Sequence, residues 1–273
     1  MKIGLIGGAG KMGEWIANYL SNHPRKFDLV IQDLNKQKGE KIAKETNAKF
    51  HTEYSDFIPE MDVVVVCVPI DSISKVIKEI SPHMKEGSLL MDIGSVKTEP
   101  IKTMKQLKNK KISLIGTHPL FGPREKEPKN QNIVLVPIKK DKWFNKLKTF
   151  LKENGFNVEV MSAKDHDKKM AIIQGLTHFL VIVFGKTLQE NGFNLKESTK
   201  FSTPTYQLFV ENLKRVFVQN PKLYAQIQLH NPYTQNIHQK FLKEFKEGRE
   251  YIKDENLQDL IDYISEGERL TEN

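Results

Sequence analysis

The stretch KIGLIGGAGKMG, residues 2–13, decides the fold. An apolar run ends in glycines spaced G-x-G-x-x-G, and an amphipathic pattern over residues 11–21 follows. This order predicts a strand, a tight turn and a helix whose free N–H groups bind a pyrophosphate. We expect the whole turn to contact a dinucleotide cofactor through Gly8, Ala9, Gly10, Lys11, Met12 and Gly13.

Each glycine of this turn has its own expected role. Gly8 permits the tight turn, Gly10 lets the backbone approach the pyrophosphate, and Gly13 allows close packing of helix on strand. The next apolar run ends at Asp33, twenty residues after Gly13. A carboxylate there accepts hydrogen bonds from the adenosine ribose and repels a 2′-phosphate. The sequence therefore predicts NAD, and the nearby lysines of residues 36 and 38 leave NADP open.

Residues 1–162 alternate between short apolar runs and helical patterns. The runs are rich in Val, Ile and Leu and nearly continuous, as in strands buried on both faces of a parallel sheet. The alternation predicts an α/β, Rossmann-type, doubly wound and mostly parallel sheet. The predicted strands are 2–7, 29–33, 63–69, 88–94, 113–118, 133–137 and 157–161, and the predicted helices are 11–21, 37–45, 73–80 and 142–154.

From residue 163 onward only helical patterns occur. Apolar residues recur every three or four positions from Ile172 to Leu188, which predicts a helix too apolar for an ordinary surface helix. Thr203-Pro204, Asn220-Pro221 and Asn231-Pro232 each place a proline at the start of a further helix. We expect residues 1–162 to bind the cofactor, and residues 163–273 to form an all-α domain that binds substrate and joins two copies into a homodimer.

Composition narrows the classes of function. The 273 residues carry a net charge of +8, but the lysines are scattered and no basic arm occurs, so we expect no nucleic-acid partner. The positive field suits a small anionic substrate. The single cysteine, Cys67, forms no intrachain disulfide, and the sequence predicts no metal site. No apolar run is long enough to predict a membrane span, so we expect a cytoplasmic protein.

Three polar or proline-marked segments follow predicted strands. Because the carboxyl ends of parallel strands line the ligand crevice, Val68 and Pro69 are candidates to line the cofactor. Ser95 and His118 end two later strands and are expected to lie near the nicotinamide. A histidine there can take a proton from a hydroxyl while hydride leaves the same carbon. The alternatives are a strand that stops at its proline and a turn histidine bonded to backbone.

The long apolar helix carries a polar stripe. Asp167, Ala171, Gln174 and His178 follow one another at spacings of four, three and four residues, which predicts one helix face turned toward a polar cleft. The alternative is a core histidine that bonds a neighbouring helix.

Arginine is scarce in this lysine-rich chain, and Arg215 lies inside an apolar helical pattern. Its planar fork suits a carboxylate ligand. The spacing also permits an ion pair with Glu211 on the same helix.

Four motifs together resemble the prephenate/arogenate dehydrogenase family: Gly8–Gly13, Gly94–Lys97, Gly116–Pro123 and Gly175–His178. The resemblance covers essentially the whole chain. Other two-domain nicotinamide dehydrogenases share the first motif but not the second and third together. The residues TPTY at 203–206 differ from many bacterial members and look more archaeal.

The resemblance implies prephenate, a small dianion, as substrate and 4-hydroxyphenylpyruvate, on the way to tyrosine, as product. His118 resembles the catalytic histidine that binds the 4-hydroxyl and accepts its proton, while hydride passes to NAD and carbon dioxide leaves. Ser95 resembles the serine beside that histidine. His178 resembles a substrate-binding histidine, and Arg215 is similar to the arginine that holds a substrate carboxylate.

Three other functions stay open at this point. Arogenate dehydrogenase performs the same chemistry on the amino-acid analogue. A 3-hydroxyacid or imine-type reductase shares the two-domain layout and uses a lysine of the second domain, for which Lys168, Lys169 and Lys186 are available. A cofactor-binding sensor without catalysis would not need His118 or Ser95, and both are present.

Overall fold

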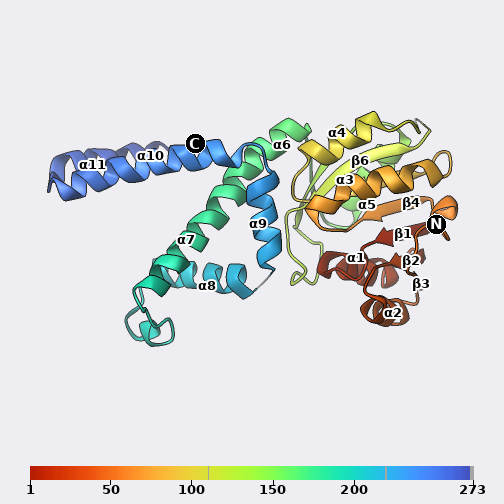
Figure 1. Cartoon of the computed structure of the whole chain (residues 1–273), viewed down its shortest axis with the longest axis horizontal. Coiled ribbons are helices and arrows are strands. Elements are labelled where there is room, and N and C mark those ends of the chain that lie inside the picture. Colours follow the sequence, from red (N-terminus) through yellow and green to blue (C-terminus); the bar gives the residue numbers. More distant parts are fainter. Residues whose placement is uncertain (110, 219, 271–273) are drawn as a thin grey trace.

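The computed structural model describes residues 1–109, 111–218 and 220–270 (Figure 1). Its first part is an eight-stranded sheet in the order β3-β2-β1-β4-β5-β6-β7-β8, parallel except where β7 pairs antiparallel with β6. This confirms the predicted mostly parallel α/β sheet, and β3 is a strand that the sequence did not predict. The strands are β1 Lys2–Ile6, β2 Asp28–Gln32, β3 Lys49–His51, β4 Val63–Val66, β5 Leu89–Asp92, β6 Ser113–Pro119, β7 Asn132–Pro137 and β8 Asn157–Val160.

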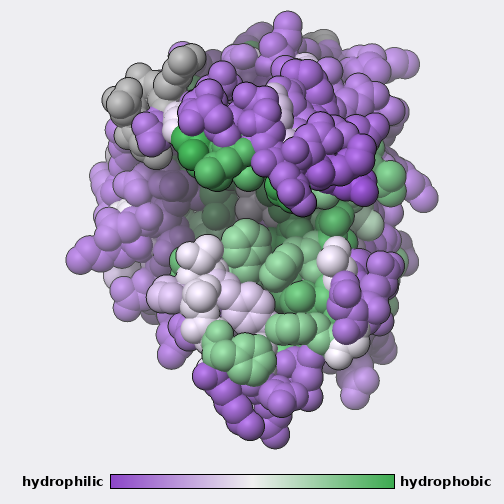
Figure 2. Space-filling view, turned by 90° about the vertical axis from the view of Figure 1, so that its left-hand side faces the viewer, coloured by the Kyte–Doolittle hydropathy of each residue, from purple (hydrophilic) through white to green (hydrophobic). Residues whose placement is uncertain are grey.

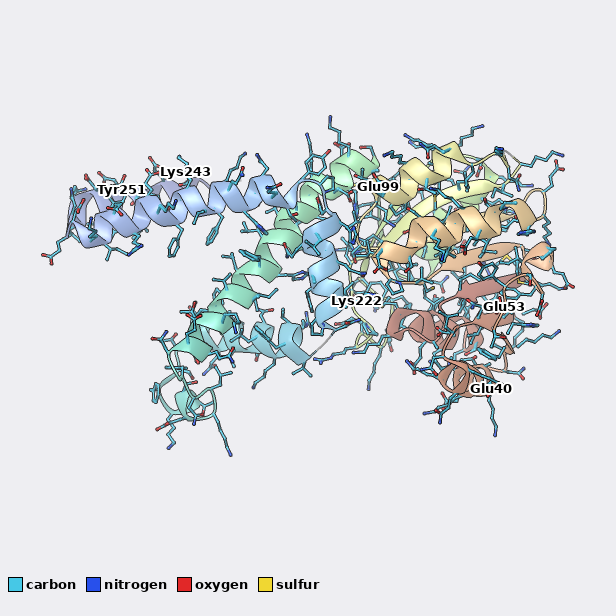
Figure 3. The ribbon with its side chains drawn as sticks, viewed as in Figure 1. Glu40, Glu53, Glu99, Lys222, Lys243 and Tyr251 are labelled. Carbon is cyan, nitrogen blue, oxygen red and sulfur yellow. The ribbon has the colours of Figure 1, made fainter. Side chains whose placement is uncertain are left out.

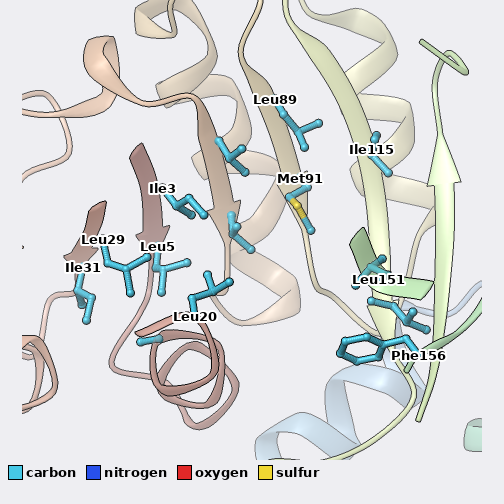
Figure 4. Close-up of a cluster of buried hydrophobic side chains, with 14 of the residues drawn as sticks. Ile3, Leu5, Leu20, Leu29, Ile31, Leu89, Met91, Ile115, Leu151 and Phe156 are labelled. Atoms are coloured by element: carbon cyan, nitrogen blue, oxygen red, sulfur yellow. The ribbon is translucent and has the colours of Figure 1, made fainter. Parts of the chain in front are cut away.

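Helices cover both faces of this sheet because successive strand residues point to opposite sides. Ile3 and Leu5 of β1 belong to the apolar cluster under α1, α2 and α5, part of which Figure 4 shows. Ile6 belongs to the opposite cluster, under α3 and α4. The helices are α1 Lys11–Ser21, α2 Lys36–Glu45, α3 Ile70–Ile80, α4 Thr98–Gln106 and α5 Lys142–Glu153, with short 3-10 turns η1 Ile58–Glu60 and η2 Ser81–His83.

The second part of the chain is helical, as predicted. It opens with a continuous helix in which a π-helical segment, η3, separates α6 from α7. Helices α8 and α9 begin at their predicted prolines, whereas α10 begins at Thr234, two residues after Pro232. The elements are α6 Ala163–Met170, η3 Ala171–Leu176, α7 Thr177–Glu190, η4 Glu197–Phe201, α8 Pro204–Val218, α9 Pro221–His230, α10 Thr234–Lys253, α11 Leu257–Ser265 and η5 Glu266–Leu270.

Helix α9 lies alongside the sheet domain, whereas α10 and α11 extend away from it (Figure 1). Gln226 of α9 accepts a hydrogen bond from the backbone N–H of Ile70, the first residue of α3, at 3.2 Å. Lys222, labelled in Figure 3, forms an ion pair with Asp71 at 3.3 Å. The residue that precedes α3, Pro69, provides no side-chain cap, so α9 supplies one.

The start of α4 is capped in the same way from the helical domain. Asp167 of α6 accepts hydrogen bonds from the backbone N–H groups of Lys97 and Thr98 at 2.9 and 2.8 Å. The Asn231 side chain in turn donates to the Asp167 carbonyl at 2.8 Å. A carboxylate at a helix N-terminus satisfies free N–H groups and interacts favourably with the helix dipole. Both crevice-side helices of this face are therefore capped by residues beyond 163.

The helical domain leaves a large apolar surface uncovered. The continuous helix Ala163–Glu190 is long and apolar enough to cross a membrane, a property that the sequence analysis did not expect, and only 17% of its most apolar window is buried. Figure 2 shows apolar side chains gathered in a hollow on this side of the molecule. The exposed apolar side chains of the helical domain include Ile172, Ile173, Val183, Leu208, Phe209, Phe217, Leu229, Leu242 and Phe245.

Candidate functional site

In the glycine turn after β1, the backbone of the turn packs closely against the backbone at the start of α1. Gly7 has the left-handed φ of +75°, so the tight turn depends on Gly7 and the role predicted for Gly8 is wrong. Gly8 is needed for space instead, because a Cβ there would lie 2.8 Å from Cγ2 of Ile31. A Cβ on Gly13 would lie 2.7 Å from the Gly8 Cα, which supports the packing role predicted for Gly13.

Asp33 lies directly against this turn. Its carboxylate accepts hydrogen bonds from the N–H groups of Ala9 and Asn35, both at 2.9 Å. Lys38 reaches the same turn from α2, donating to the Ala9 carbonyl at 2.6 Å and pairing with Glu14 at 3.1 Å. The turn, the N-terminus of α1 and a carboxylate at the end of β2 therefore meet at one point, which fits an adenosine diphosphate moiety.

The remaining predicted cofactor residues border the same turn. Val68 packs against it, since a Cβ on Gly7 would lie 2.8 Å from Cγ1 of Val68. Pro69 directly precedes α3. Lys11 is exposed at the start of α1, and Met12 beside it is partly buried. Their contact with the cofactor stays a prediction.

His118 lies on β6 and is 2% exposed. Its Nδ1 is 2.8 Å from Nε2 of His166, and Nδ1 of His166 is 2.7 Å from a carboxylate oxygen of Asp167. The three side chains form a buried hydrogen-bonded chain that runs from the sheet into α6. His166 was not among the site residues predicted from the sequence. Two adjacent polar residues, His166 and Asp167, stand at the start of the long helix and could have indicated it. Only Asp167 falls on the predicted polar stripe.

Burial lowers the pKa of His118 well below its ordinary value, and the charges of His166 and Lys97 act in the same direction. The neutral imidazole is therefore the resting form of His118. Burial also acts on Asp167, in the sense that raises its pKa, but hydrogen bonds from His166, Thr98 and the Lys97 backbone outweigh it. The pKa of Asp167 is thus held below the usual range and the group is a carboxylate.

A buried ion pair lies beside the glycines of two motifs. Lys97, fully buried, pairs with Asp92 at the end of β5 and donates to the Thr117 carbonyl of β6 at 2.7 Å. A Cβ on Gly116 would lie 2.9 Å from Cδ1 of Ile101 and 3.2 Å from Cδ of Lys97, and one on Gly94 would lie 2.5 Å from Cδ1 of Ile73 and 3.1 Å from Asp92. Both glycines therefore leave room for apolar packing and for the ion pair, which joins the two strand ends beside His118.

Ser95 is half-buried just after β5. Within the described part of the chain no hydrogen bond joins it to His118, and its role beside that histidine stays a prediction. The partner that approaches His118 on its open side is Gln174, whose Nε2 is 3.4 Å from Nε2 of His118. Its amide oxygen is buried without a hydrogen-bond partner in the described residues.

His178 lies on α7, half-buried, with its ring edge-on to Tyr224 at 4.8 Å between centroids. Burial lowers the pKa of His178 to about 4, and its Nδ1 is buried without a hydrogen-bond partner in the described residues. Gln174 and His178 thus each hold an unused polar atom, as expected of ligand-binding side chains. Asp167 departs from the predicted stripe because it caps α4.

Arg215 is exposed on α8, as is Arg124 in the loop after β6. Burial raises the pKa of Tyr224, while the positive charges of Arg215 and Arg124 lower it, so both guanidinium groups lie within electrostatic range of the phenol. The loop is held by Trp15, whose indole N–H donates to the Glu125 carbonyl at 2.6 Å. Arg124 was not among the site residues predicted from the sequence. Its signal was that arginine is scarce in this chain and that Arg124 directly follows the Gly116–Pro123 motif.

The lysines considered for a reductase lie elsewhere. Lys168, Lys169 and Lys186 are all exposed, whereas the neighbouring His166 and Asp167 are buried toward His118. A glycine-turn nucleotide site, a buried histidine at a strand end and a helical domain that closes over it define the class of two-domain dinucleotide-binding proteins.

Comparison with known proteins narrows this class. Residues 16–160 match the sequence model described as prephenate dehydrogenase, nucleotide-binding domain, and residues 162–266 match the model described as prephenate dehydrogenase, dimerization domain. The chain belongs to the prephenate dehydrogenase family, which confirms the resemblance inferred from the four motifs. The match to the second model also assigns the dimerization domain of the family to the helical part of the chain.

One relative is the probable arogenate/prephenate dehydrogenase of Methanocaldococcus jannaschii, 39% identical over 269 residues. The alignment covers 97% of this chain and 60% of the relative, so the chain spans about 60% of that protein's length. Among solved structures, prephenate dehydrogenase from Aquifex aeolicus, in complex with hydroxyphenyl propionate and NAD+, matches with a TM-score of 0.79 at 24% identity, covering 100% of this chain and 99% of that one. Synechocystis arogenate dehydrogenase matches with a TM-score of 0.74 at 20% identity, covering 100% and 99%. These two likenesses support the fold.

Proposed function

We propose that the chain oxidises and decarboxylates prephenate to 4-hydroxyphenylpyruvate, with hydride transfer to NAD, in tyrosine biosynthesis. The observation that carries this proposal is the position of His118. His118 lies near the carboxyl end of β6, at the same edge of the parallel sheet as the nucleotide turn after β1. Its Nδ1 is 2.8 Å from His166, and among the described residues its Nε2 has only the 3.4 Å contact with Gln174. An incoming hydroxyl has a free nitrogen to which it can donate.

The proposed reaction requires the protein to accept one proton and to position the substrate, without forming a covalent bond to it. NAD, when bound, supplies the hydride acceptor. His118 accepts the proton of the 4-hydroxyl at Nε2, a role that its lowered pKa favours because the imidazole stays neutral at neutral pH. Loss of carbon dioxide and aromatisation drive the reaction forward, so positioning of the substrate hydroxyl at Nε2 of His118 supplies most of what remains.

Charge favours prephenate over arogenate. Arg215 and Arg124 place two positive charges near Tyr224, beside His178. Prephenate carries two carboxylates and no cation, whereas arogenate carries an ammonium group on its side chain. A site with two nearby guanidinium groups binds the dianion more favourably than the zwitterionic side chain. Arogenate stays the second candidate because the Methanocaldococcus jannaschii relative carries both activities in its name.

We further propose that residues 1–162 bind NAD in preference to NADP, through Asp33, and that residues 163–273 bind substrate and pair with a second copy. The exposed apolar face of the continuous helix supports a homodimer more than a membrane span, because the same helix carries the buried polar residues His166 and Asp167 and the partly buried Gln174. A cytoplasmic location follows from this assignment. Light scattering that gives the mass of one 31.5 kDa chain would contradict the dimer.

The experiment that tests the proposed function is formation of reduced nicotinamide from NAD, with prephenate and arogenate compared under identical conditions. We expect turnover of prephenate to exceed that of arogenate. His118→Asn should lower turnover about 100-fold or more, the usual contribution of a general base, while NAD still binds. No turnover of either substrate by a protein that binds NAD would overturn the proposal and favour a hydroxyacid or imine reductase.

A further inference from the structure

We infer that His166 and Asp167 form a proton relay behind His118, so that the positive charge created when His118 takes the substrate's proton comes to rest on His166 rather than on His118. The inference rests on the proposed function. His166 and Asp167 touch neither substrate nor cofactor, and both are positioning residues for His118. What carries the inference is one continuous, fully buried hydrogen-bonded chain with two contacts of 2.8 and 2.7 Å.

The pair fixes the tautomer of His118. The Asp167 carboxylate accepts only, so the hydrogen between it and His166 lies on Nδ1 of His166. Neutral His166 then has a lone pair at Nε2, and the hydrogen between the two rings must lie on Nδ1 of His118. His118 is left with a lone pair on Nε2, the nitrogen that faces Gln174. Asp167 thereby prepares His118 as a base from two side chains away.

The pair also stabilises the positive charge better than His118 can. His118 takes the hydroxyl proton at Nε2 and releases its own Nδ1 proton to Nε2 of His166. One N–H bond forms and one breaks on His118, which ends neutral, and the positive charge rests on His166. There it is in contact with the Asp167 carboxylate at 2.7 Å, and Asp167 keeps its charge throughout. A buried cation is far better placed beside a carboxylate than on His118, which has no such partner.

The other charged groups around the chain do not take over this role. Asp92 and Lys97 pair with each other, and burial raises the pKa of Asp92 and lowers that of Lys97. The charge of Lys97 disfavours a cation on His118. The second oxygen of Asp167 is occupied by the backbone and hydroxyl of Thr98, which keeps the carboxylate oriented toward His166. The environment therefore favours a cation on His166 alone.

Two substitutions of His166 separate its functions. In His166→Gln the amide oxygen still accepts the Nδ1 hydrogen of His118, so the tautomer is kept, but the amide cannot take the proton. In His166→Phe both functions are lost. We expect kcat with prephenate to fall about 10-fold to 100-fold in His166→Gln and about 1,000-fold or more in His166→Phe, by analogy with loss of a tautomer-fixing partner in other histidine bases. NAD affinity should stay within about twofold, because neither variant touches the nucleotide turn; equal NAD affinity also shows that the variants are folded.

His23→Gln is the matched control. His23 is also buried, with Nε2 2.8 Å from the Asn154 side chain and Nδ1 accepting from the Arg25 backbone, but it lies in the first domain away from His118. We expect that variant to lose stability and keep kcat. Equal kcat values for the His166 variants and the control would overturn the inference.

The pH profile provides a readout that a purely structural role would not move. In the proposed relay, a proton taken up at Nε2 of His118 is stabilised because the Nδ1 proton can pass to His166, beside the Asp167 carboxylate. The amide of His166→Gln cannot accept that proton, so protonation of His118 becomes less favourable and the acid limb of kcat/KM moves to lower pH. An acid limb that stays in place in an active variant contradicts the pair. If instead the unsubstituted protein turns over neither prephenate nor arogenate, the proposed function fails. That result is distinct from an active protein whose kcat and pH profile do not change when His166 is replaced.

Discussion

Replacement of Gly13 by alanine tests how the nucleotide turn is packed. A Cβ at this position would lie 2.7 Å from the Cα of Gly8 and 2.8 Å from the carbonyl oxygens of Gly7 and Gly8. All three are backbone atoms, so no side chain can rotate away to relieve the contact. The turn itself is held by the left-handed conformation of Gly7 and by the contact of Gly8 with Ile31.

Two effects oppose each other in this variant. Alanine in a helix is about 1 kcal/mol more favourable than glycine. Overpacking costs about 1–3 kcal/mol, and contact with backbone on every side puts this case at the upper end. We therefore expect Gly13→Ala to lower the free energy of unfolding by about 1–2 kcal/mol. Displacement of the turn also moves the N–H groups that meet the pyrophosphate, and a loss of about 1.4 kcal/mol there weakens NAD binding tenfold.

Urea unfolding followed by fluorescence of the two tryptophans measures the first effect, and calorimetric titration with NAD measures the second. Gly248→Ala, in α10, is the control, because the three atoms nearest to its Cβ would all belong to the Tyr263 side chain, the nearest at 3.1 Å. That side chain can move, so the control should keep its stability or gain some. A Gly13→Ala protein that matches the control in stability and binds NAD as tightly as the unsubstituted chain would refute the packing argument.

Two further predictions follow from single side chains. Asp33→Ser should narrow the preference for NAD over NADP, because the group that repels a 2′-phosphate is removed while Lys38 stays at the turn; an unchanged ratio of kcat/KM for the two cofactors would contradict the role of Asp33. Burial lowers the pKa of His178 to about 4, so the unfolded chain binds a proton at this residue below pH 6.5 that the folded chain does not. Stability should therefore fall between pH 6.5 and 4, and at pH 5 this residue contributes a loss of about 2 kcal/mol relative to pH 7. Urea unfolding of His178→Gln at both pH values should show a smaller loss by that amount, and equal losses would show that His178 is not responsible.

The sheet was predictable because buried parallel strands leave a strong pattern. The run at Val63–Val66 is apolar without interruption, that at Leu89–Asp92 is apolar up to its final aspartate, and all seven predicted strands are present. Strand β3 was not predicted because its three residues, Lys49–His51, lie at the sheet edge and need no apolar pattern. Helix α4 was not predicted because no local capping residue marks its N-terminus. The cap is Asp167, seventy residues further along the chain.

The candidate site was predictable where one strand end carries one reactive residue, as for His118 and Asp33. It was not predictable where the helical domain meets the sheet. Gln174 of the predicted stripe approaches His118 at 3.4 Å, but His166 lies beside the stripe rather than on it. Its contact with His118 depends on where α6 lies relative to the end of β6, and residue spacing along a helix carries no information about that placement.

The capping of α3 and α4 by the helical domain has a consequence for how the protein melts. Gln226 and Asp167 satisfy backbone N–H groups that the sheet domain cannot satisfy itself, and a helix start buried without a partner is unfavourable. Withdrawal of the helical domain would therefore fray the helices that flank the site. We expect heat to unfold the two parts in a single calorimetric transition, and His118 to lose its partners in the same step.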